Sequence, residues 1–458
     1  MSRTSLLVFV LVVAGLATAL MAYATRDSSG SPSAAAIPQP TAEQLEAAYL
    51  GKLPIASESK RVDVVAPTFT NPTAITNPLF PISELHSAVL SGMVDDKAFH
   101  TETTLLPETR IIEWAEGQKV ETLVSQYLAY LDGRIEEVAL DYYAQADDGS
   151  VWYFGEDVFN YEDGFIADTD GTWIAGKEAP PAMIMPADPK RGDVYRPENA
   201  PGLVFEEVTV KTVDKRVAGP FDSVDGAIVA GELHQDGSRE NKTFAPGYGE
   251  FFTAADGDVE AMAVAVPTDA LDGPLPDALE TLTVSADATF AAIRAGNWTA
   301  ASGSAAKLDG AWTNYRSQHV PPRIAAEMSS AVVALDRAVA ARDRVRAGNA
   351  AIDVAQSALD LQLRYRPPTE IDRARFELWT RQLLVDATAR NVAGVRGDLA
   401  TLEWIRDRFA ATLDNVDLTR VDTQLVGLRA ALNDDEFRGI SARAARLRTT
   451  IAGVVTRE

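Results

Sequence analysis

The chain has 458 residues, a formal net charge of −24 and no cysteine. The length allows two or three domains, while the absence of cysteine excludes disulfides, thiol catalysis and thiolate metal sites. The charge is unevenly distributed and argues against nucleic-acid binding. Residues 1–276 have 43 Asp and Glu against 18 Lys and Arg, whereas residues 277–458 have 23 against 24. This difference predicts two modules joined by a linker over residues 269–276.

Residues 1–24 have the pattern of a secretory signal. Arg3 precedes an apolar run over residues 6–21, and residues 22–24 read Ala-Tyr-Ala, a small-x-small cleavage site. The apolar run is short for a membrane span, which needs about 20 residues. Counting residues 5–24 makes an uncleaved signal anchor the alternative. Both interpretations predict an exported protein (secreted, periplasmic or at the cell surface) that meets the membrane only through this segment.

Residues 25–60 predict a disordered tether. Ser, Pro, Ala and Gly dominate residues 25–40, which offer too few large apolar side chains to offset the entropy of ordering. Within the tether, residues 41–50 predict one short helix, because Glu43 and Glu46 place negative charge near its start.

Residues 61–268 predict an acidic antiparallel β domain, and we expect its sheet to be curved. Short apolar runs such as residues 151–154 and 208–210 alternate with turns. Asp-Gly pairs, for example at residues 148–149 and 163–164, are a strong local signal for hairpins. Helical patterns do not alternate with these runs, so a doubly wound parallel sheet is not expected.

Residues 141–173 hold nine of the chain's 35 aromatic residues. One interpretation is an aromatic-lined site for an apolar or small ligand; the simpler one is cross-strand packing inside the sheet. The two are compatible if the curved sheet is only partly filled. The candidate ligand-binding residues are Tyr143, Trp152, Phe154 and Trp173.

The same segment carries a family resemblance. Residues 141–156 (DYYAQADDGSVWYFGE) resemble a block of uncharacterised bacterial secreted proteins that reads Asp-Trp-Tyr-Ala-Gln and then Val-Trp-Tyr-Phe-Gly-Glu. Residues 77–82 (NPLFPI) resemble the opening of the same domain. The chain departs from the pattern at Tyr142, at Ala146 and over residues 83–89. The resemblance implies an exported β domain and carries no established activity.

Acidic residues crowd the same stretch and raise the question of a metal site. Hard cations such as Ca²⁺ take six to eight oxygen ligands, and the candidate ligands are Asp147, Asp148, Asp168 and Asp170. The spacing after Asp168 does not match an EF-hand loop, and the alternative is that these residues form turns. The four histidines are scattered, so zinc, copper and haem are not expected. Ca²⁺ is therefore the one candidate cofactor.

Residues 277–458 predict an antiparallel α-helical bundle. Apolar residues recur at spacings of three and four, and breaks at residues 296–297, 321–322, 348–349, 367–368 and 434–435 divide the segment into about eight helices. Short connections favour an up-and-down bundle, either one elongated bundle or two stacked ones. A ferritin-like metal site is excluded because no histidine follows His319. The fold class expected for the whole chain is thus α+β, a curved antiparallel sheet followed by an all-α bundle.

No catalytic motif was identified, so a binding function is expected. The leading hypothesis is an exported envelope protein that binds an apolar or small ligand, or another envelope protein, at the aromatic part of the sheet. One alternative is a structural adaptor that docks through its bundle, which a large exposed apolar helix face would favour. The other is a hydrolase with paired carboxylates, which two carboxylates converging in a cleft would favour.

Overall fold

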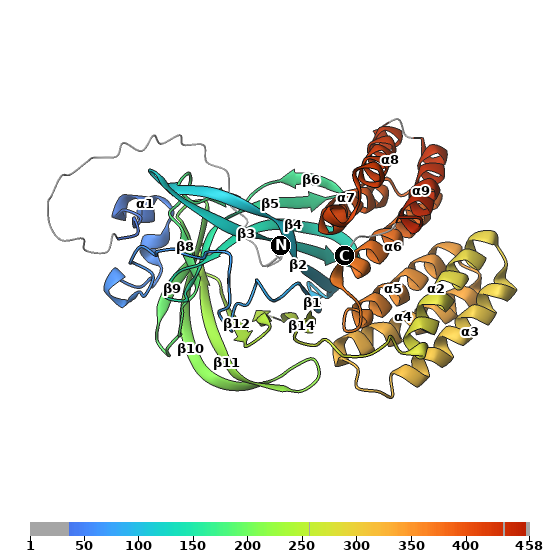
Figure 1. The fold of residues 1–458 in the computed structure, drawn as a ribbon, viewed down its shortest axis with the longest axis horizontal. Helices are drawn as coiled ribbons and strands as arrows, with labels where there is room; N and C mark the ends of the chain where they lie inside the picture. The colour runs from blue at the N-terminus through green and yellow to red at the C-terminus, as the bar shows by residue number, and fades with distance from the viewer. Residues whose placement is uncertain (1–35, 256, 434–435, 455–458) are drawn as a thin grey trace.

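The computed structural model describes residues 36–255, 257–433 and 436–454 (Figure 1). It confirms the expected fold class: one large antiparallel sheet is formed by the first part of the chain, and helices form the rest. The predicted signal segment, residues 1–24, and the first part of the predicted tether lie outside the described residues.

The sheet consists of two meanders that are joined side by side through the first strand in sequence and the last. One meander is formed by β1–β6 and the other by β9–β14, and neighbouring strands follow the order β6-β5-β4-β3-β2-β1-β14-β13-β12-β11-β10-β9. The junction is the antiparallel pair β1–β14, in which Ser87 lies opposite Val266. The strands are β1 (Ser87–Val94), β2 (Lys97–Ala115), β3 (Gln118–Leu131), β4 (Arg134–Gln145), β5 (Val151–Glu162), β6 (Phe165–Asp168), β7 (Trp173–Ile174), β8 (Ala182–Met185), β9 (Val194–Ala200), β10 (Val204–Ala218), β11 (Ser223–His234), β12 (Arg239–Ala245), β13 (Gly249–Ala255) and β14 (Asp258–Val266).

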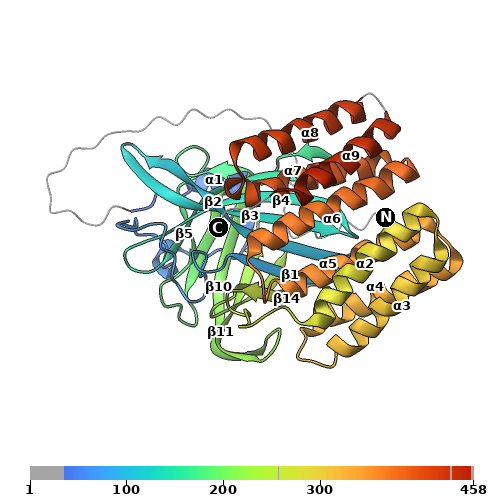
Figure 2. The ribbon, with the colours of Figure 1, turned by 45° about the vertical axis from the view of Figure 1, so that its right-hand side comes forward.

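The sheet is strongly curved without being closed. Strand β8 pairs with β5 and also contacts β9, so the two ends of the strand order approach each other. The curvature gives the sheet a concave face and a convex face, and the helices cover part of the convex one (Figures 1 and 2).

Tight turns of the expected kind connect several strands. Asp132 and Gly133 between β3 and β4 both have positive φ, 50° and 71°, as do Asp163 and Gly164 between β5 and β6, 51° and 75°. Two successive positive φ values are typical of the type I′ hairpin turn, whose twist matches that of the strands. The Asp-Gly pairs therefore do set these hairpins.

The segment before the sheet is ordered from residue 36, so the prediction of disorder is wrong over residues 36–60. It contains the expected short helix, α1 (Ala42–Ala47), with a capping box between Thr41 and Gln44, and two 3₁₀ turns, η1 (Leu50–Lys52) and η2 (Glu58–Lys60). Ile37 and Leu50 are buried. The composition gave no sign of this outcome, because the segment is held by a few specific contacts, among them the burial of Ile37 and Leu50 and the hydrogen bond from Ala56 N to Glu207.

Within the described residues, eight helices follow the sheet, in two groups of four (Figure 2). Helices α2–α5 share one hydrophobic core and α6–α9 another, while α6 also contributes Ile371, Leu378 and Val385 to the first core. Of the two arrangements expected, two joined bundles is the one found. The helices are α2 (Asp277–Ala295), α3 (Trp298–Tyr315), α4 (Pro322–Ala341), α5 (Arg344–Gln362), α6 (Pro368–Ala389), α7 (Val392–Phe409), α8 (Asn415–Asn433) and α9 (Phe437–Ala452), with a 3₁₀ turn, η3 (Ala410–Thr412), after α7.

Three of the expected helix breaks are found, at residues 296–297, 321–322 and 367–368, and a fourth, at residues 434–435, lies outside the described residues. Residues 348–349 lie inside α5, and the real boundary is at Arg342, which adopts the left-handed conformation, and Asp343, whose side chain caps α5. Gly348 instead permits close packing: a Cβ there would lie 3.0 Å from a methyl carbon of Val385 on α6. A glycine that serves helix contact was thus misread as a helix end.

The two modules share a core and are not separate bodies. On the convex face, Leu128, Tyr130 and Val138 belong to the same hydrophobic cluster as Phe376 and Phe409 of the second bundle. The ring of Tyr130 stacks on that of Trp379 at 5.2 Å between centroids.

The start of the predicted linker, Asp269, is also buried, and its carboxylate accepts hydrogen bonds from Tyr248 Oη and Ala265 N. Among the helices of the described residues, none combines the length and apolar composition that a membrane span needs.

Candidate functional site

The four aromatic residues predicted to bind a ligand are all buried, and they lie on two faces of β5. Tyr143 stacks on Tyr153 at 4.8 Å, and Trp173 meets Tyr153 edge-on at 5.4 Å. Trp152 and Phe154 flank Tyr153 along the strand, and therefore point to the opposite face. The four side chains consequently do not line one cavity, and packing accounts for their burial.

The four predicted metal-ligating aspartates are not brought together. Asp147 and Asp148 precede β5, whereas Asp168 pairs with Asn160 near the far end of that strand. About nine residues of extended chain separate the two ends, roughly 30 Å.

Backbone N–H groups of the protein satisfy three of these carboxylates. Asp147 accepts from Thr70 N at 2.7 Å, Asp148 from Ser150 N at 2.9 Å, and Asp168 from Asp170 N at 3.1 Å. The turn interpretation of these residues is the one that the structure favours.

A different set of acidic residues converges, on the concave face of the sheet. Strand register places them on one face: Asp141 lies opposite Glu156, Glu198 opposite Glu206, and Glu232 opposite Glu240. We call the set the concave-face carboxylates; its nine members are Glu137, Asp141, Glu156, Glu198, Glu206, Glu232, Glu240, Glu250 and Glu260.

Curvature brings these carboxylates face to face across the sheet. Glu137 on β4 is close enough to Glu198 on β9 and Glu260 on β14 for their charges to add to the effect of burial in raising its pKa. Burial and then the charge of Glu198 likewise raise the pKa of Glu156. A set of acids that lies far apart along the sheet thus shares one interior.

No hydrogen bond within the described residues offsets the burial of the Glu156 carboxyl group. Its side chain is almost completely buried, at 1% exposure for the residue, and neither carboxylate oxygen accepts a hydrogen bond from the described residues. The nearby Glu198 carboxyl can satisfy Glu156 only if the two share a proton, because two ionised carboxylates in contact repel each other. Burial, followed by the charge of Glu206, raises the pKa of Glu198 to about 8.

Two basic side chains lie within the set, and both are already engaged. His234 Nδ1 is 3.0 Å from Glu206, and its Nε2 is 3.4 Å from Glu240. Although burial opposes protonation, these two carboxylates raise the pKa of His234 to about 11, so that it is an imidazolium at neutral pH. Lys242 Nζ lies 3.2 Å from Glu232, 3.7 Å from Glu240 and 3.8 Å from Glu250.

The remaining five carboxylates have no such neighbour. Within the described parts of the chain, no basic side chain lies within 4.0 Å of any of them. Burial raises the pKa of Asp141 and that of Glu260 to about 7 in each case, with a further contribution from the charge of Glu250. The five are Glu137, Asp141, Glu156, Glu198 and Glu260.

The site reaches solvent at Glu250, whose side chain is 37% exposed, whereas that of Lys242 beside it is 15% exposed. Hydroxyl-bearing rings are interleaved with the acids on the concave face. Tyr153 donates to Asp141 at 2.6 Å, and Tyr195 lies opposite Val208, one strand away from Glu232. Such rings offer π faces that attract cations.

A second buried charge cluster joins the convex face to the second bundle. Glu102 on β2 forms an ion pair with Arg375 Nε at 3.2 Å and another with Arg408. Arg375 also pairs with Asp360 at 2.7 Å, and Arg408 donates to Gln126 Oε1 at 2.6 Å. Against the effect of burial, the two arginines hold the pKa of Glu102 well below its usual range.

Two groups of described residues have ligand atoms close enough together to hold a metal ion: His100, Glu102 and Asp360, and Glu206, Glu232 and His234. The first already contains the guanidinium of Arg375. In the second, the carboxylates already form ion pairs, Glu206 with the imidazolium of His234 and Glu232 with the ammonium of Lys242. Both groups are thus neutralised by the chain itself, and the first is best explained as a structural junction between the modules.

The concave-face carboxylates were not expected from the sequence. The signal that it contained was a series of acidic pairs within apolar strands, such as Glu136-Glu137 and Glu206-Glu207, where alternation forces one acid of each pair inward. Comparison with models of protein families and with curated proteins finds no match to the chain.

Proposed function

We propose that the protein acts by binding, without catalysis, and that its ligand is an organic cation with amine groups held by the concave-face carboxylates. The observation that carries the proposal is the set of five enclosed carboxylates without a basic neighbour, and Glu156 above all. Burying a carboxylate is expensive unless it is paired or protonated. A bound cation would remove that penalty.

The spread of the acids favours an amine over a single metal ion. No three ligand atoms drawn from Glu137, Asp141, Glu156, Glu198 and Glu260 lie within 4.8 Å of one another in the described structure. A metal ion needs its oxygen ligands at about 2.0–2.6 Å, whereas a chain with several ammonium groups spans separated carboxylates. Lys242 supports this choice, because its own alkylammonium already lies among three of the acids.

The two alternative functions receive less support. A hydrolase needs two carboxylates that flank the bond to be cleaved, whereas the contact between Glu156 and Glu198 is that of a pair sharing a proton. An adaptor would need a continuous apolar helix face. The most exposed large apolar residues of the described helices are scattered valines, namely Val284 on α2, Val333 on α4, Val345 on α5, and Val416 and Val426 on α8. We retain export to the cell envelope as part of the proposal, on the pattern of residues 1–24.

Isothermal titration of the full chain with putrescine, spermidine and CaCl₂ tests this proposal. We expect binding of at least one amine, and loss of it in the double variant Glu156→Gln/Glu198→Gln, which keeps side-chain shape and removes the charge. Glu108→Gln, at an exposed position on β2, is the matched control. Calcium binding without amine binding, or amine binding that the double variant leaves unchanged, would refute it.

A further inference from the structure

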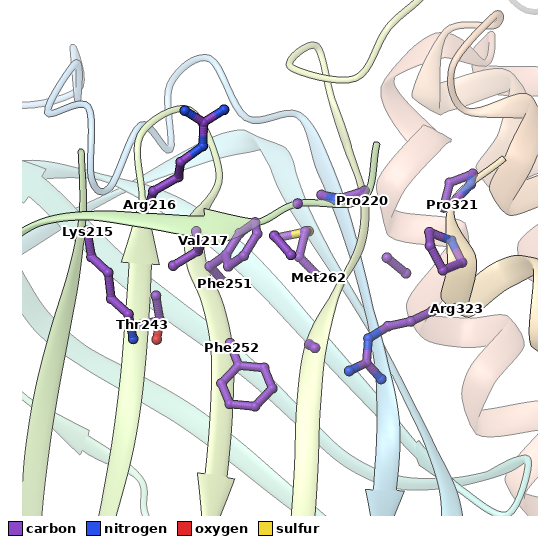
Figure 3. A pocket seen from close by; sticks show the side chains of 15 residues that line it. Lys215, Arg216, Val217, Pro220, Thr243, Phe251, Phe252, Met262, Pro321 and Arg323 are labelled. Atoms are coloured by element: carbon purple, nitrogen blue, oxygen red, sulfur yellow. The ribbon is translucent and has the colours of Figure 1, made fainter. Parts of the chain in front are cut away.

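A cavity of about 490 Å³ lies on the side of the sheet next to the first helical bundle (Figure 3). The end of β10 forms one wall, β13 and β14 form its floor, and the start of α4 forms the other wall. This volume is within the range of pockets that hold small-molecule ligands. It involves none of the concave-face carboxylates, so its role is independent of the function proposed above.

The lining of this cavity is apolar in the middle and basic at its edges. Phe251, Phe252 and Met262 line the centre, Phe251 and Met262 with only 5% of each residue exposed, and in the view of Figure 3 they lie between Lys215 and Arg323. Phe252 is only partly buried. An apolar surface flanked by charge is the arrangement that an amphiphilic ligand requires.

The charge of the lining is opposite to that of the surrounding module. None of the 15 residues that line the cavity is acidic, and three are basic, although residues 1–276 carry a net charge of −25, from 18 basic and 43 acidic residues. Arg216 pairs with Asp225 at 3.6 Å and points away from the apolar side chains in Figure 3.

Lys215 and Arg323, in contrast, have no carboxylate within 4.0 Å in the described part of the chain. Arg323 donates only to the backbone oxygen of Ser91, at 3.1 Å.

We infer that this cavity binds an amphiphilic anion, with its hydrocarbon tail against Phe251, Phe252 and Met262 and its carboxylate or phosphate head drawn to the edge of the cavity by the positive charge of Lys215 and Arg323. The two cations come from different modules, Lys215 from the sheet and Arg323 from the start of α4. Arginine and lysine both recognise such heads through charge-assisted hydrogen bonds. The tail gains from leaving water, by about 0.8 kcal/mol for each buried CH₂.

Fluorescence titration of the full chain with cis-parinaric acid tests the inference. We expect saturable binding that Lys215→Gln and Arg323→Gln each weaken by about three- to tenfold. Lys211→Gln is the matched control, because Lys211 is exposed on the same strand and does not line the cavity. Since Arg323 also bonds to the sheet, the melting temperature of each variant is measured, and Lys215→Gln carries the test if Arg323→Gln fails to fold.

Competition experiments then measure the contributions of the charged head and of the hydrocarbon tail separately. Palmitate and lysophosphatidate are expected to displace the probe, and the stronger competitor identifies a carboxylate or a phosphate head; acetate and inorganic phosphate, which lack a tail, are expected not to. Equal affinity for parinaryl alcohol, which has no charge, would overturn the inference. So would binding that neither basic-residue variant alters, because the probe would then be held elsewhere, for example by the apolar run near the N-terminus.

Discussion

Replacing Glu198 with glutamine is expected to change how stability depends on pH. Burial and the charge of Glu206 raise the pKa of Glu198 from 4.5 to about 8. A carboxyl with a raised pKa keeps its proton in the folded state over a pH range in which the unfolded chain has released it. The free energy of unfolding therefore falls as pH rises, by about 1.4 kcal/mol per pH unit for each such proton. For Glu198 the interval of about 3.5 units corresponds to roughly 5 kcal/mol.

Urea unfolding followed by tryptophan fluorescence, at several pH values between about 5 and 8, measures this slope. Glu198→Gln removes the proton-binding group and also removes the charge that acts on Glu156. The free energy of unfolding is therefore expected to fall less steeply with pH, by at least about 1.4 kcal/mol per pH unit. Asp141 and Glu260, whose pKa values are raised to about 7, keep part of the slope. Glu108→Gln should leave it unchanged. Equal slopes in the wild type and in Glu198→Gln would refute the assignment of an enclosed, proton-holding carboxyl.

Three further substitutions probe the same architecture. Lys242→Ala removes the ammonium from between three carboxylates, and we expect a loss of about 3–5 kcal/mol of stability, partly restored by added butylammonium; absence of any restoration would argue against an amine-sized space. Glu102→Gln leaves Arg375 without its shared carboxylate and should lose about 3–5 kcal/mol in urea unfolding at neutral pH. Since the pKa of Glu102 is lowered, its contribution is present above the unfolded pKa and lost on acidification, so the variant should also lose less stability between pH 7 and acid than the wild type. Gly155→Ala places a Cβ 2.1 Å from a backbone oxygen at a φ of 113°, and its melting temperature should fall well below that of Gly117→Ala, a positive-φ position with open space around it.

Much of the fold could be predicted because its signals are local. Asp132-Gly133 and Asp163-Gly164 encode their turns within two residues, and Pro321-Pro322 and Pro367-Pro368 mark helix starts in the same way. The break expected at Gly348 was wrong because glycine serves equally for a helix end and for close packing, and only the neighbouring Val385 decides between them.

The candidate site could not be predicted, since it depends on contacts between distant segments. Glu156 and Glu198 lie on β5 and β9 and meet only because the sheet curves. Alternation along a strand normally separates a buried face from a solvated one. It fails over residues 124–126 and 128–130, which are buried on both faces because the helices cover the convex side. Periodicity in the sequence therefore indicates that one acid of a pair such as Glu136-Glu137 points inward, but not which of the two.

The junction between β1 and β14 has a consequence for how the chain folds. Pairing of Ser87 with Val266 means that the sheet is complete only after nearly all of its strands are present, and such long-range pairing slows folding. The convex face then needs Arg375 and Arg408 before Glu102 is neutralised. The change in composition near residue 276 therefore does not divide the chain into two parts that unfold independently. A fragment ending there would expose Tyr130 and leave a buried carboxylate unpaired. We expect the sheet and the second bundle to unfold in a single transition.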